Sequence, residues 1–276
     1  MFALLSADFA EQLPIAKQAT ADVMDAIRGV DLEPLSRRSP ALAGYEWTAY
    51  LHCSIARIVR VLRTLEQHSA GSRVLDFGSY FGNFSLACRS AGYDVDAIDS
   101  YDAYGAAFAN VVAAQRAAGI SVQDFSQTGF DLAATADATY DAVLCMGVIE
   151  HIPHTPRLLL DTVTRVLKPG GILILDTPNL AYLYKRLALL DGGTVFCPIA
   201  LQYYTELPFE GHHREYVVDE VAWMLDAAGH APVSMETFNY SFLAQTAITG
   251  PHLGYHEAMD ADPGLREVIF SVSRRR

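Results

Sequence analysis

The sequence predicts an α/β protein with a mostly parallel sheet. From residue 73 onward, short apolar segments alternate with helical segments, and the first apolar segment runs into a turn that contains glycines. The chain has 276 residues, of which 51% are hydrophobic, so it is long enough to bury a large core. We therefore expect an N-terminal helical segment over 1–68, followed by one elaborated sheet domain over 69–276.

Apolar residues recur three or four positions apart between Trp47 and Leu65, which predicts a long helix. Packing against the sheet is the favoured interpretation of this helix, and a cap over a ligand is the alternative. The predicted strands are 73–77, 94–98, 120–124, 141–146, 171–176, 232–238 and 267–273, and the predicted helices lie near 83–91, 103–117, 156–167 and 218–228. The Lys-Pro-Gly-Gly segment at 168–171 predicts a helix end followed by a turn. The last two strands predict a final antiparallel pair.

The turn after the first predicted strand is where α/β proteins bind nucleosides. Asp76 lies in that strand, and Gly78 and Gly82 lie in the turn, where small residues let the backbone approach a ligand. A dinucleotide-binding turn has glycines at its first, third and sixth positions, but Tyr80 and Asn83 occupy the third and sixth here. The spacing therefore argues against a nicotinamide dinucleotide.

The pattern Asp-x-Gly-x-x-x-Gly resembles motif I of the class I S-adenosylmethionine-dependent methyltransferases, with Tyr80 in place of the usual middle glycine. The resemblance spans about residues 70–230 and is to bacterial members that act on small molecules or glycans. It implies a Rossmann-like fold of seven strands with a final antiparallel strand, and S-adenosylmethionine as the cofactor. The cofactor-binding residues that it implies are Asp76, Gly78, Ser79, Tyr80, Gly82, Asp99, Asp124, Phe125 and Met146.

Two acids at strand ends carry particular roles in this resemblance. Asp99 closes the second strand and matches the acid that binds both ribose hydroxyls. Asp124 and Phe125 match the pair that meets the adenine amino group and ring, although an aspartate that only forms a turn is the rival interpretation of Asp124.

The fourth predicted strand leads into Glu150, His151 and Pro153, which resembles the strand end beside the methyl group in small-molecule methyltransferases. His151 is the candidate general base because imidazole titrates near neutrality. The alternative is a histidine that only hydrogen-bonds to the backbone at this junction. The segment lacks the Asn/Asp-Pro-Pro-aromatic pattern of enzymes that methylate amino groups of bases or glutamine, which disfavours those acceptors.

A second polar cluster, residues 211–216, precedes the helix near 218–228. His212 is a candidate partner of His151 in removing a proton, and Arg214 and Tyr216 are candidates for binding the acceptor. The alternative for Arg214 is a surface ion pair with Glu215. A metal bound by Glu150, His151 and His212 would suit the ligand types, but no closely spaced pair of ligands supports it, so no metal is predicted.

The segment 180–216 is rich in tyrosine and leucine and follows the fifth strand. A long insertion at the carboxyl ends of parallel strands is the position of a substrate lid. It is equally suited to be the contact of a homodimer, because aromatic residues favour interfaces.

A net charge of -12 and a pI near 5.1 argue against nucleic acid as a partner. The four cysteines have no metal-ligand spacing and are predicted to be reduced core residues. No signal peptide and no apolar run of membrane-spanning length are evident, so a cytoplasmic protein without a membrane partner is expected.

Together these observations predict methyl transfer from S-adenosylmethionine to a small-molecule acceptor. The predicted reaction is O-methylation of a sugar or secondary-metabolite hydroxyl, with histidine as the base. The alternatives are N- or C-methylation of a small metabolite, a nicotinamide-dependent oxidoreductase, and a non-catalytic nucleoside-binding subunit.

Overall fold

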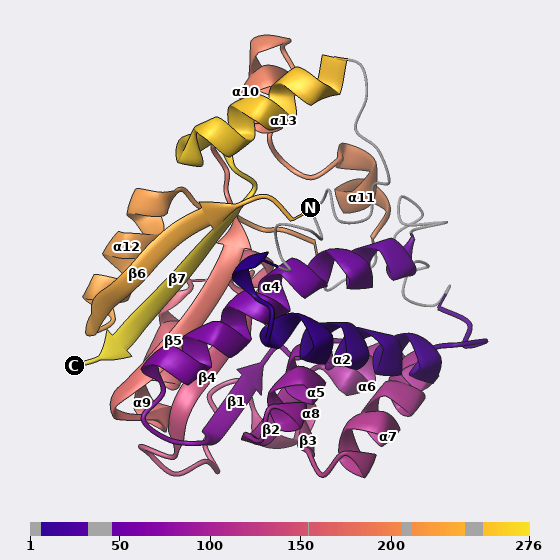
Figure 1. The fold of residues 1–276 in the computed structure, drawn as a ribbon, viewed down its shortest axis with the longest axis vertical. Coiled ribbons are helices and arrows are strands. Elements are labelled where there is room, and N and C mark those ends of the chain that lie inside the picture. Colours follow the sequence, from indigo (N-terminus) through magenta and orange to yellow (C-terminus); the bar gives the residue numbers. More distant parts are fainter. Residues whose placement is uncertain (1–6, 33–45, 154, 206–210, 241–250) are drawn as a thin grey trace.

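The computed structural model describes residues 7–32, 46–153, 155–205, 211–240 and 251–276. Seven strands form one sheet in the order β3-β2-β1-β4-β5-β7-β6 (Figure 1). The strands are β1 Arg73–Phe77, β2 Asp94–Asp99, β3 Ser121–Asp124, β4 Tyr140–Met146, β5 Leu167–Pro178, β6 His230–Phe238 and β7 Val268–Arg275. The first five are parallel, and β7 runs antiparallel to both β5 and β6. The predicted fold class is confirmed.

Helices cover both faces of this sheet. The α-helices of the described chain are α2 Gln12–Ala26, α4 Trp47–His68, α5 Asn83–Ser90, α6 Tyr101–Tyr104, α7 Ala109–Ala117, α8 Phe125–Thr128, α9 Arg157–Val166, α10 Leu183–Leu190, α11 Ile199–Tyr204, α12 Val218–Ala227 and α13 Pro251–Ala261, and 3₁₀ turns lie at Gly105–Phe108, Ile149–His151 and Pro263–Leu265.

Each strand sends alternate residues to opposite faces, as the pleat requires. In β1, Val74 belongs to a core shared with α2, α4, α5 and α7, whereas Leu75 belongs to a core shared with α9 and α12. Parallel strands are buried on both faces, which explains why they have continuous apolar sequences. The sheet therefore separates two cores.

The N-terminal helices pack on the sheet as the periodicity of residues 47–65 predicted. Leu51, Ile58 and Leu62 of α4 are fully buried in the first core, and α2 packs across α4 and α5. Trp47 and Tyr50, at the start of α4, reach the turn after β1. The helical segment thus contacts the candidate site, and the division into segments 1–68 and 69–276 stays a prediction.

Two predicted elements differ from those observed. The helix predicted over 103–117 is interrupted at Gly105, whose backbone angles of φ 59° and ψ −144° are incompatible with a helix. The Lys-Pro-Gly-Gly segment ends α9 as predicted, but it belongs to β5 rather than to a turn. Leu167 pairs with Tyr140 and Ile172 with Ala142, so four residues of β5 lie opposite one residue of β4 and form an irregular bulge.

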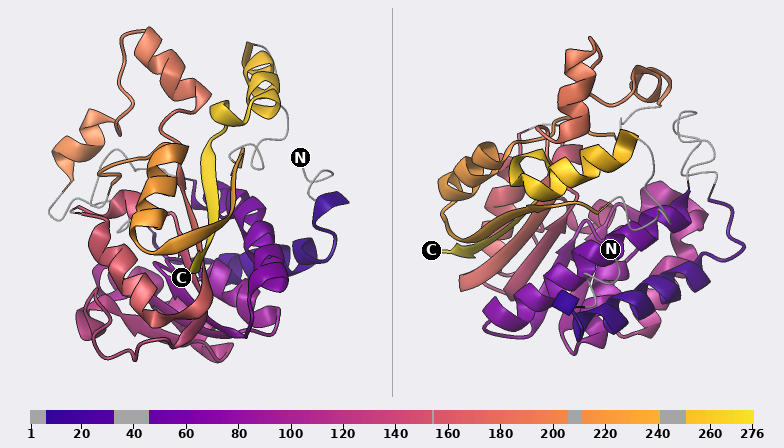
Figure 2. Two further views of the ribbon diagram at one scale, coloured as in Figure 1. Left: turned by 90° about the vertical axis from the view of Figure 1, so that its left-hand side faces the viewer. Right: turned by 45° about the horizontal axis from the view of Figure 1, so that its top comes forward.

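The segment between β5 and α12 leaves the sheet and carries α10 and α11 (Figures 1 and 2). Its large exposed apolar side chains are Leu189, Leu190, Phe196, Ile199, Tyr203 and Tyr204. Residues 206–210 of the predicted lid lie outside the described residues. Among the described helices, none combines the length and the apolar composition that crossing a bilayer requires.

None of the four cysteines, all of which lie in the described part of the chain, forms a disulfide bond. Cys53, Cys88 and Cys145 are buried as predicted. Cys197 is only half-buried and lies between α10 and α11, so the prediction of a core position was wrong for this residue. The reason is that its apolar neighbours in the sequence belong to the exposed segment rather than to a core.

Candidate active site

The turn between β1 and α5 brings the predicted glycines into the left-handed conformation. Gly78 has φ 79° and Gly82 has φ 72°. A Cβ atom on Gly78 would lie 2.4 Å from Val148 Cγ2, and one on Gly82 would lie 2.3 Å from Gln115 Cδ. Both glycines are therefore required by backbone conformation and by packing within the protein, in addition to the predicted approach of a ligand.

Tyr80 occupies the position of the missing middle glycine and also has a positive φ of 46°. A non-glycine residue in this region costs about 1–2 kcal/mol. The ring compensates by packing at 4.5 Å from Phe81 and 5.2 Å from Phe108, measured between ring centroids, with Trp47 and Tyr50 at about 6 Å. The turn therefore keeps a left-handed residue at the glycine position, held there by an aromatic cluster.

Asp99 ends β2 and is buried beside this turn. Its carboxylate accepts hydrogen bonds from the backbone N–H groups of Tyr80 at 2.7 Å and Ser100 at 2.6 Å and from the Tyr104 hydroxyl at 3.1 Å. Burial raises the pKa of Asp99, while these donors and the nearby His151 act to lower it. A carboxylate has about four acceptor positions, of which these three donors use three, and the contact of Asp99 with two ribose hydroxyls stays a prediction.

Asp124 lies directly beside Asp99, because the two residues are paired in β2 and β3. Its carboxylate caps α8, accepting from the backbone N–H of Ser126 at 2.7 Å and of Asp102 at 2.6 Å. Burial opposes ionisation, but these hydrogen bonds lower the pKa of Asp124. The structure thus shows the turn-forming role that was the rival interpretation, and the role toward adenine stays a prediction for Asp124 and Phe125.

The predicted cofactor residues that remain lie around the same turn. Ser79 is buried and its hydroxyl bonds to Tyr101 Oη at 2.7 Å, and Met146 is buried at the end of β4. Asp76 accepts a hydrogen bond from Ser85 Oγ at 2.5 Å, and burial raises the pKa of Asp76 to about 7. These groups form the floor of the turn, and their contact with a cofactor stays a prediction.

Asn83, the first residue of α5, has a buried Nδ2 atom without a hydrogen-bond partner in the parts of the chain that the structure describes. An unpaired buried amide costs free energy, and a donor at a helix N-terminus suits an anion. Together with the Asp99 carboxylate, this donor fits a ligand that has both a carboxylate and a ribose, as S-adenosylmethionine has. The sequence alone indicated Asn83 only as a residue at a position where a dinucleotide-binding turn has glycine.

Sequence reasoning missed Arg57, which reaches from α4 to the end of β5. Its guanidinium makes two hydrogen bonds of 2.6 Å to the Asp176 carboxylate, and both side chains are buried. Asp176 pairs with Met146 in the neighbouring strand, and Arg57 Nη2 is 3.0 Å from the place of a Cβ on Gly147. This ion pair therefore packs against the start of the segment that carries His151. Nothing in the local sequence around Arg57 signals it.

The two predicted histidines come together although they are 61 positions apart in the chain. The ring centroids of His151 and His212 are 4.7 Å apart, with the rings edge to face at 81°. His151 is exposed, whereas His212 is half-buried. The backbone N–H of His213 donates to the Glu150 carbonyl at 2.7 Å and joins the two segments. Their meeting makes concerted action on one acceptor feasible.

Burial, then the proximity of His151 and Lys185, lowers the pKa of His212. Its Nδ1 lies 2.9 Å from Glu215 Oε1. Glu150 is buried and accepts a hydrogen bond from Thr177 Oγ1 at 3.0 Å, and burial raises the pKa of Glu150. The site thus contains a neutral imidazole that is held by a carboxylate.

One donor atom each from Glu150, His151 and His212 lies within 4.8 Å of the others. Such a set of one carboxylate and two imidazoles is compatible with a divalent cation. The sequence argument against a metal relied on the lack of a closely spaced ligand pair, and tertiary structure supplies the proximity that spacing did not. The prediction that no metal binds stays untested.

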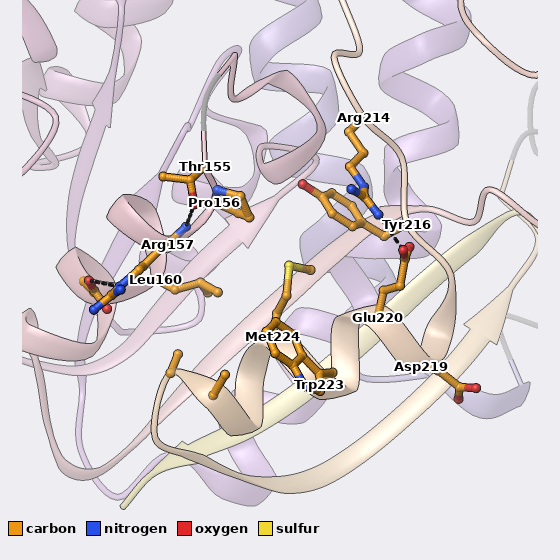
Figure 3. Close-up of a pocket in the computed structure, with 13 residues that line it drawn as sticks. Thr155, Pro156, Arg157, Leu160, Arg214, Tyr216, Asp219, Glu220, Trp223 and Met224 are labelled. Carbon is orange, nitrogen blue, oxygen red and sulfur yellow. Dashed lines mark hydrogen bonds and ion pairs between the residues drawn. The ribbon is translucent and has the colours of Figure 1, made fainter.

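Arg214 and Tyr216 lie in a groove of about 850 Å³ between α9 and α12 (Figure 3). Arg214 forms an ion pair of 2.5 Å with Glu220, and its guanidinium lies 5.5 Å from the centroid of the Tyr216 ring. The alternative partner expected for Arg214 was Glu215, but Glu215 contacts His212 instead. Apolar residues that line the groove include Leu160, Met224, Ala227 and Ala228.

The sheet order, the acid at the end of β2 and the left-handed turn after β1 define a nucleoside-binding protein of the class I methyltransferase fold. Comparison with protein families agrees, because residues 47–235 match a family described as a methyltransferase domain. The chain belongs to this methyltransferase family. The predicted family and fold class are confirmed, and membership in this family implies S-adenosylmethionine as the cofactor.

Several relatives show where the likeness extends. The chain is 32% identical over 166 residues to the ubiquinone biosynthesis O-methyltransferase of Xanthomonas oryzae pv. oryzae (strain PXO99A), covering 57% of this chain and 62% of that protein. It is 33% identical over 147 residues to the Psychrobacter arcticus enzyme of the same name, covering 48% and 54%. The matches thus span 62% and 54% of the length of these two curated relatives.

Solved structures extend the likeness in fold. An S-adenosylmethionine-dependent methyltransferase from Archaeoglobus fulgidus superposes with a TM-score of 0.53 at 15% identity, covering 80% of this chain and 93% of that one. At such identity the likeness concerns the fold alone.

Proposed function

We propose that this protein transfers the methyl group of S-adenosylmethionine to a hydroxyl oxygen of a small-molecule acceptor. The observation that carries this proposal is the contact between the rings of His151 and His212. His151 also lies close enough to Asp99, the candidate ribose acid, to act to lower the pKa of that carboxyl. The names of the curated relatives, which specify O-methyltransferases of ubiquinone biosynthesis, support an oxygen acceptor. A sugar or secondary-metabolite hydroxyl remains the predicted acceptor class.

S-adenosylmethionine supplies an activated methyl group on a sulfonium centre. In this proposal Asp99 holds the ribose hydroxyls and Asn83 donates to the carboxylate of the amino-acid part. Much of the rate enhancement then comes from positioning, which contributes about 7–11 kcal/mol in well-oriented reactions. The aromatic cluster around Tyr80 excludes water from the same edge.

His151 removes the acceptor proton as the new oxygen–carbon bond forms. It is exposed and therefore accessible to an acceptor, and its ring lies against His212, which is held by Glu215. A positioned general base contributes about 10²–10⁴-fold to the rate. His212 orients the pair, and Arg214 and Tyr216 extend the acceptor site into the groove between α9 and α12.

The test begins with ligand binding. S-adenosylhomocysteine and NADH are added separately to the purified protein, and the melting temperature is recorded, since a ligand of the native state raises it. We expect stabilisation by S-adenosylhomocysteine alone; stabilisation by NADH alone would support an oxidoreductase. A panel of sugar, phenolic and amine acceptors is then screened for methylated product, whose site of methylation distinguishes O- from N- and C-transfer.

The base is tested with His151→Gln, and His68→Gln serves as the matched control because His68 lies at the far end of α4. We expect His151→Gln to lower kcat by about 10²–10⁴-fold and to leave the affinity for S-adenosylhomocysteine unchanged. Full turnover in His151→Gln would remove the base role from this residue. Binding of S-adenosylhomocysteine without any product would favour a non-catalytic subunit.

A further inference from the structure

Lys185, in the first turn of α10, is a charged residue that the structure draws inward. Its side chain is only 14% exposed, and it forms an ion pair with Glu215, whose side chain is 11% exposed. Burying two charges is costly unless they compensate each other and their remaining hydrogen-bonding groups are satisfied. A buried pair in an otherwise exposed segment therefore calls for an explanation.

The contacts of the two carboxylate oxygens of Glu215 supply part of this explanation. Glu215 Oε2 contacts Lys185, while Oε1 lies 2.9 Å from Nδ1 of His212. An ionised carboxylate only accepts hydrogen bonds, so Nδ1 of His212 carries the hydrogen of this bond. In a neutral ring the lone pair then belongs to Nε2. The ring of His212 in turn packs against His151.

An ion pair that only attached α10 to the rest of the protein would not need to lie beside the histidine pair. Lys185 also interacts electrostatically with Glu150, the residue next to His151: burial lowers the pKa of Lys185 to about 8, and Glu150 opposes that shift. Lys185 thus faces buried carboxylates on both segments that carry the histidines. Its Nζ lies 5.5 Å from the centroid of the Tyr182 ring.

We propose that Lys185 is a positioning residue of the acceptor site. Through Glu215 it fixes the orientation and the tautomer of His212, so that the segment containing α10 helps to build the histidine pair. The chain of contacts runs from Lys185 to Glu215, His212 and His151. The effect on turnover rests on the proposed function, whereas the effect on the His212 ring does not.

The ring state is measured first, by ¹H–¹⁵N correlation spectra of the histidine side chains, with His212 assigned through His212→Gln. Wild-type protein is compared with Lys185→Met, Lys185→Arg and Glu215→Gln. Lys168→Met is the matched control, because Lys168, at the start of β5, forms a partly buried ion pair of 2.8 Å with Asp141 of β4. We expect the Nδ1-protonated tautomer of His212 in wild type, Lys185→Arg and Lys168→Met. Lys185→Met and Glu215→Gln should show a mixture of tautomers.

Turnover is measured on the same variants with an acceptor from the screen. We expect Lys185→Met to lower kcat by about 100-fold, with little change in the affinity for S-adenosylhomocysteine. Lys185→Arg should restore most of the activity. Thermal melting of each variant verifies that it is folded.

Two results would overturn the proposal. One is an unchanged His212 tautomer in a folded Lys185→Met protein, and the other is a kcat within twofold of wild type in that variant. If no acceptor is found at all, the proposed function fails while the spectra still decide the role of Lys185. If Lys185→Met does not fold, the spectra of Lys185→Arg and Glu215→Gln are compared instead. An unchanged His212 tautomer in Glu215→Gln then contradicts the proposal.

Discussion

The cofactor side and the acceptor side of this site are built in different ways. On the cofactor side, the turn after β1 meets the ends of β2 and β3, which hydrogen bonds of the sheet already place side by side. The Tyr80 amide donates to Asp99, and Asp99 pairs with Asp124 in register. A local motif therefore suffices to define this side once the strands are aligned.

The acceptor side is assembled from segments that no sequence motif connects. Arg57 bonds to Asp176 across 119 positions, and the Glu150 segment meets the 211–216 segment through the bond from His213. Long-range pairs of this kind depend on how helices and loops pack on the finished sheet. The comparison teaches that cofactor recognition is a property of the sheet, whereas acceptor chemistry is a property of the packing around it.

The largest expected effect tests the anchoring of the acceptor side. Arg57→Met should lower the free energy of unfolding by about 3–5 kcal/mol, because Asp176 would remain as an uncompensated buried charge. Urea denaturation measures this loss. Arg73→Met, which removes a pair that is half exposed on its arginine side, should cost about 1 kcal/mol or less.

A double variant separates the desolvation cost from the anchoring role. Arg57→Met combined with Asp176→Leu should recover much of the lost stability, because a buried ion pair replaced by apolar groups is often neutral. Equal losses in Arg57→Met and Arg73→Met would show that α4 is not held by this pair, and the distinction between the two sides would weaken.

The next effect concerns the cofactor side and depends on pH. The pKa of Asp76 is about 7 in the folded protein against 3.8 as its ordinary value, because burial disfavours the charge. Its contribution to stability is thus fully present below about pH 4 and is lost as the pH rises toward 7. At 1.36 kcal/mol per pKa unit, the loss amounts to about 4 kcal/mol at most.

Asp76→Asn should remove this dependence, since the Ser85 hydroxyl can still donate to the amide oxygen. We expect the variant to be more stable than wild type at pH 8 and to lose that advantage at pH 5. Denaturation curves at both pH values measure it. An advantage that does not change with pH would show that Asp76 is ionised in the folded protein at both values.

The sequence predicted the sheet and the cofactor side because their signals are local. Apolar runs with turns between them specify the strands, and the spacing from Asp76 to Asp99 follows from one strand–helix–strand unit. Tyr80 appeared as a departure from the motif, but its backbone keeps the left-handed conformation of the usual glycine. The interruption at Gly105 shows the limit of periodicity, since a single backbone conformation ended a helix whose apolar pattern continued.

The acceptor side was predicted only as separate residues. The sequence indicated His151 and the 211–216 cluster as candidates, and it offered Glu215 as an ion-pair partner of Arg214. In the structure Glu215 contacts His212 and Lys185 instead. Lys185 and Arg57 carry no local signal, because a lysine or arginine on a helix is most often solvated. Only the tertiary structure shows that these two are buried beside the site.

The smallest expected effect on stability concerns Arg214 at the rim of the acceptor side. Its side chain is 64% exposed and its ion pair with Glu220 is open to solvent, so Arg214→Ala should change the free energy of unfolding by less than about 1 kcal/mol.

If Arg214 binds the acceptor, its loss should raise the acceptor KM several-fold and leave kcat unchanged, because such binding is equal in the ground state and the transition state. Arg157→Ala is the matched control, since it removes a similarly exposed pair on the opposite wall of the groove. A rise in KM for Arg214→Ala alone would place the acceptor along α12, whereas equal KM values for both variants and wild type would confine it to the histidine pair.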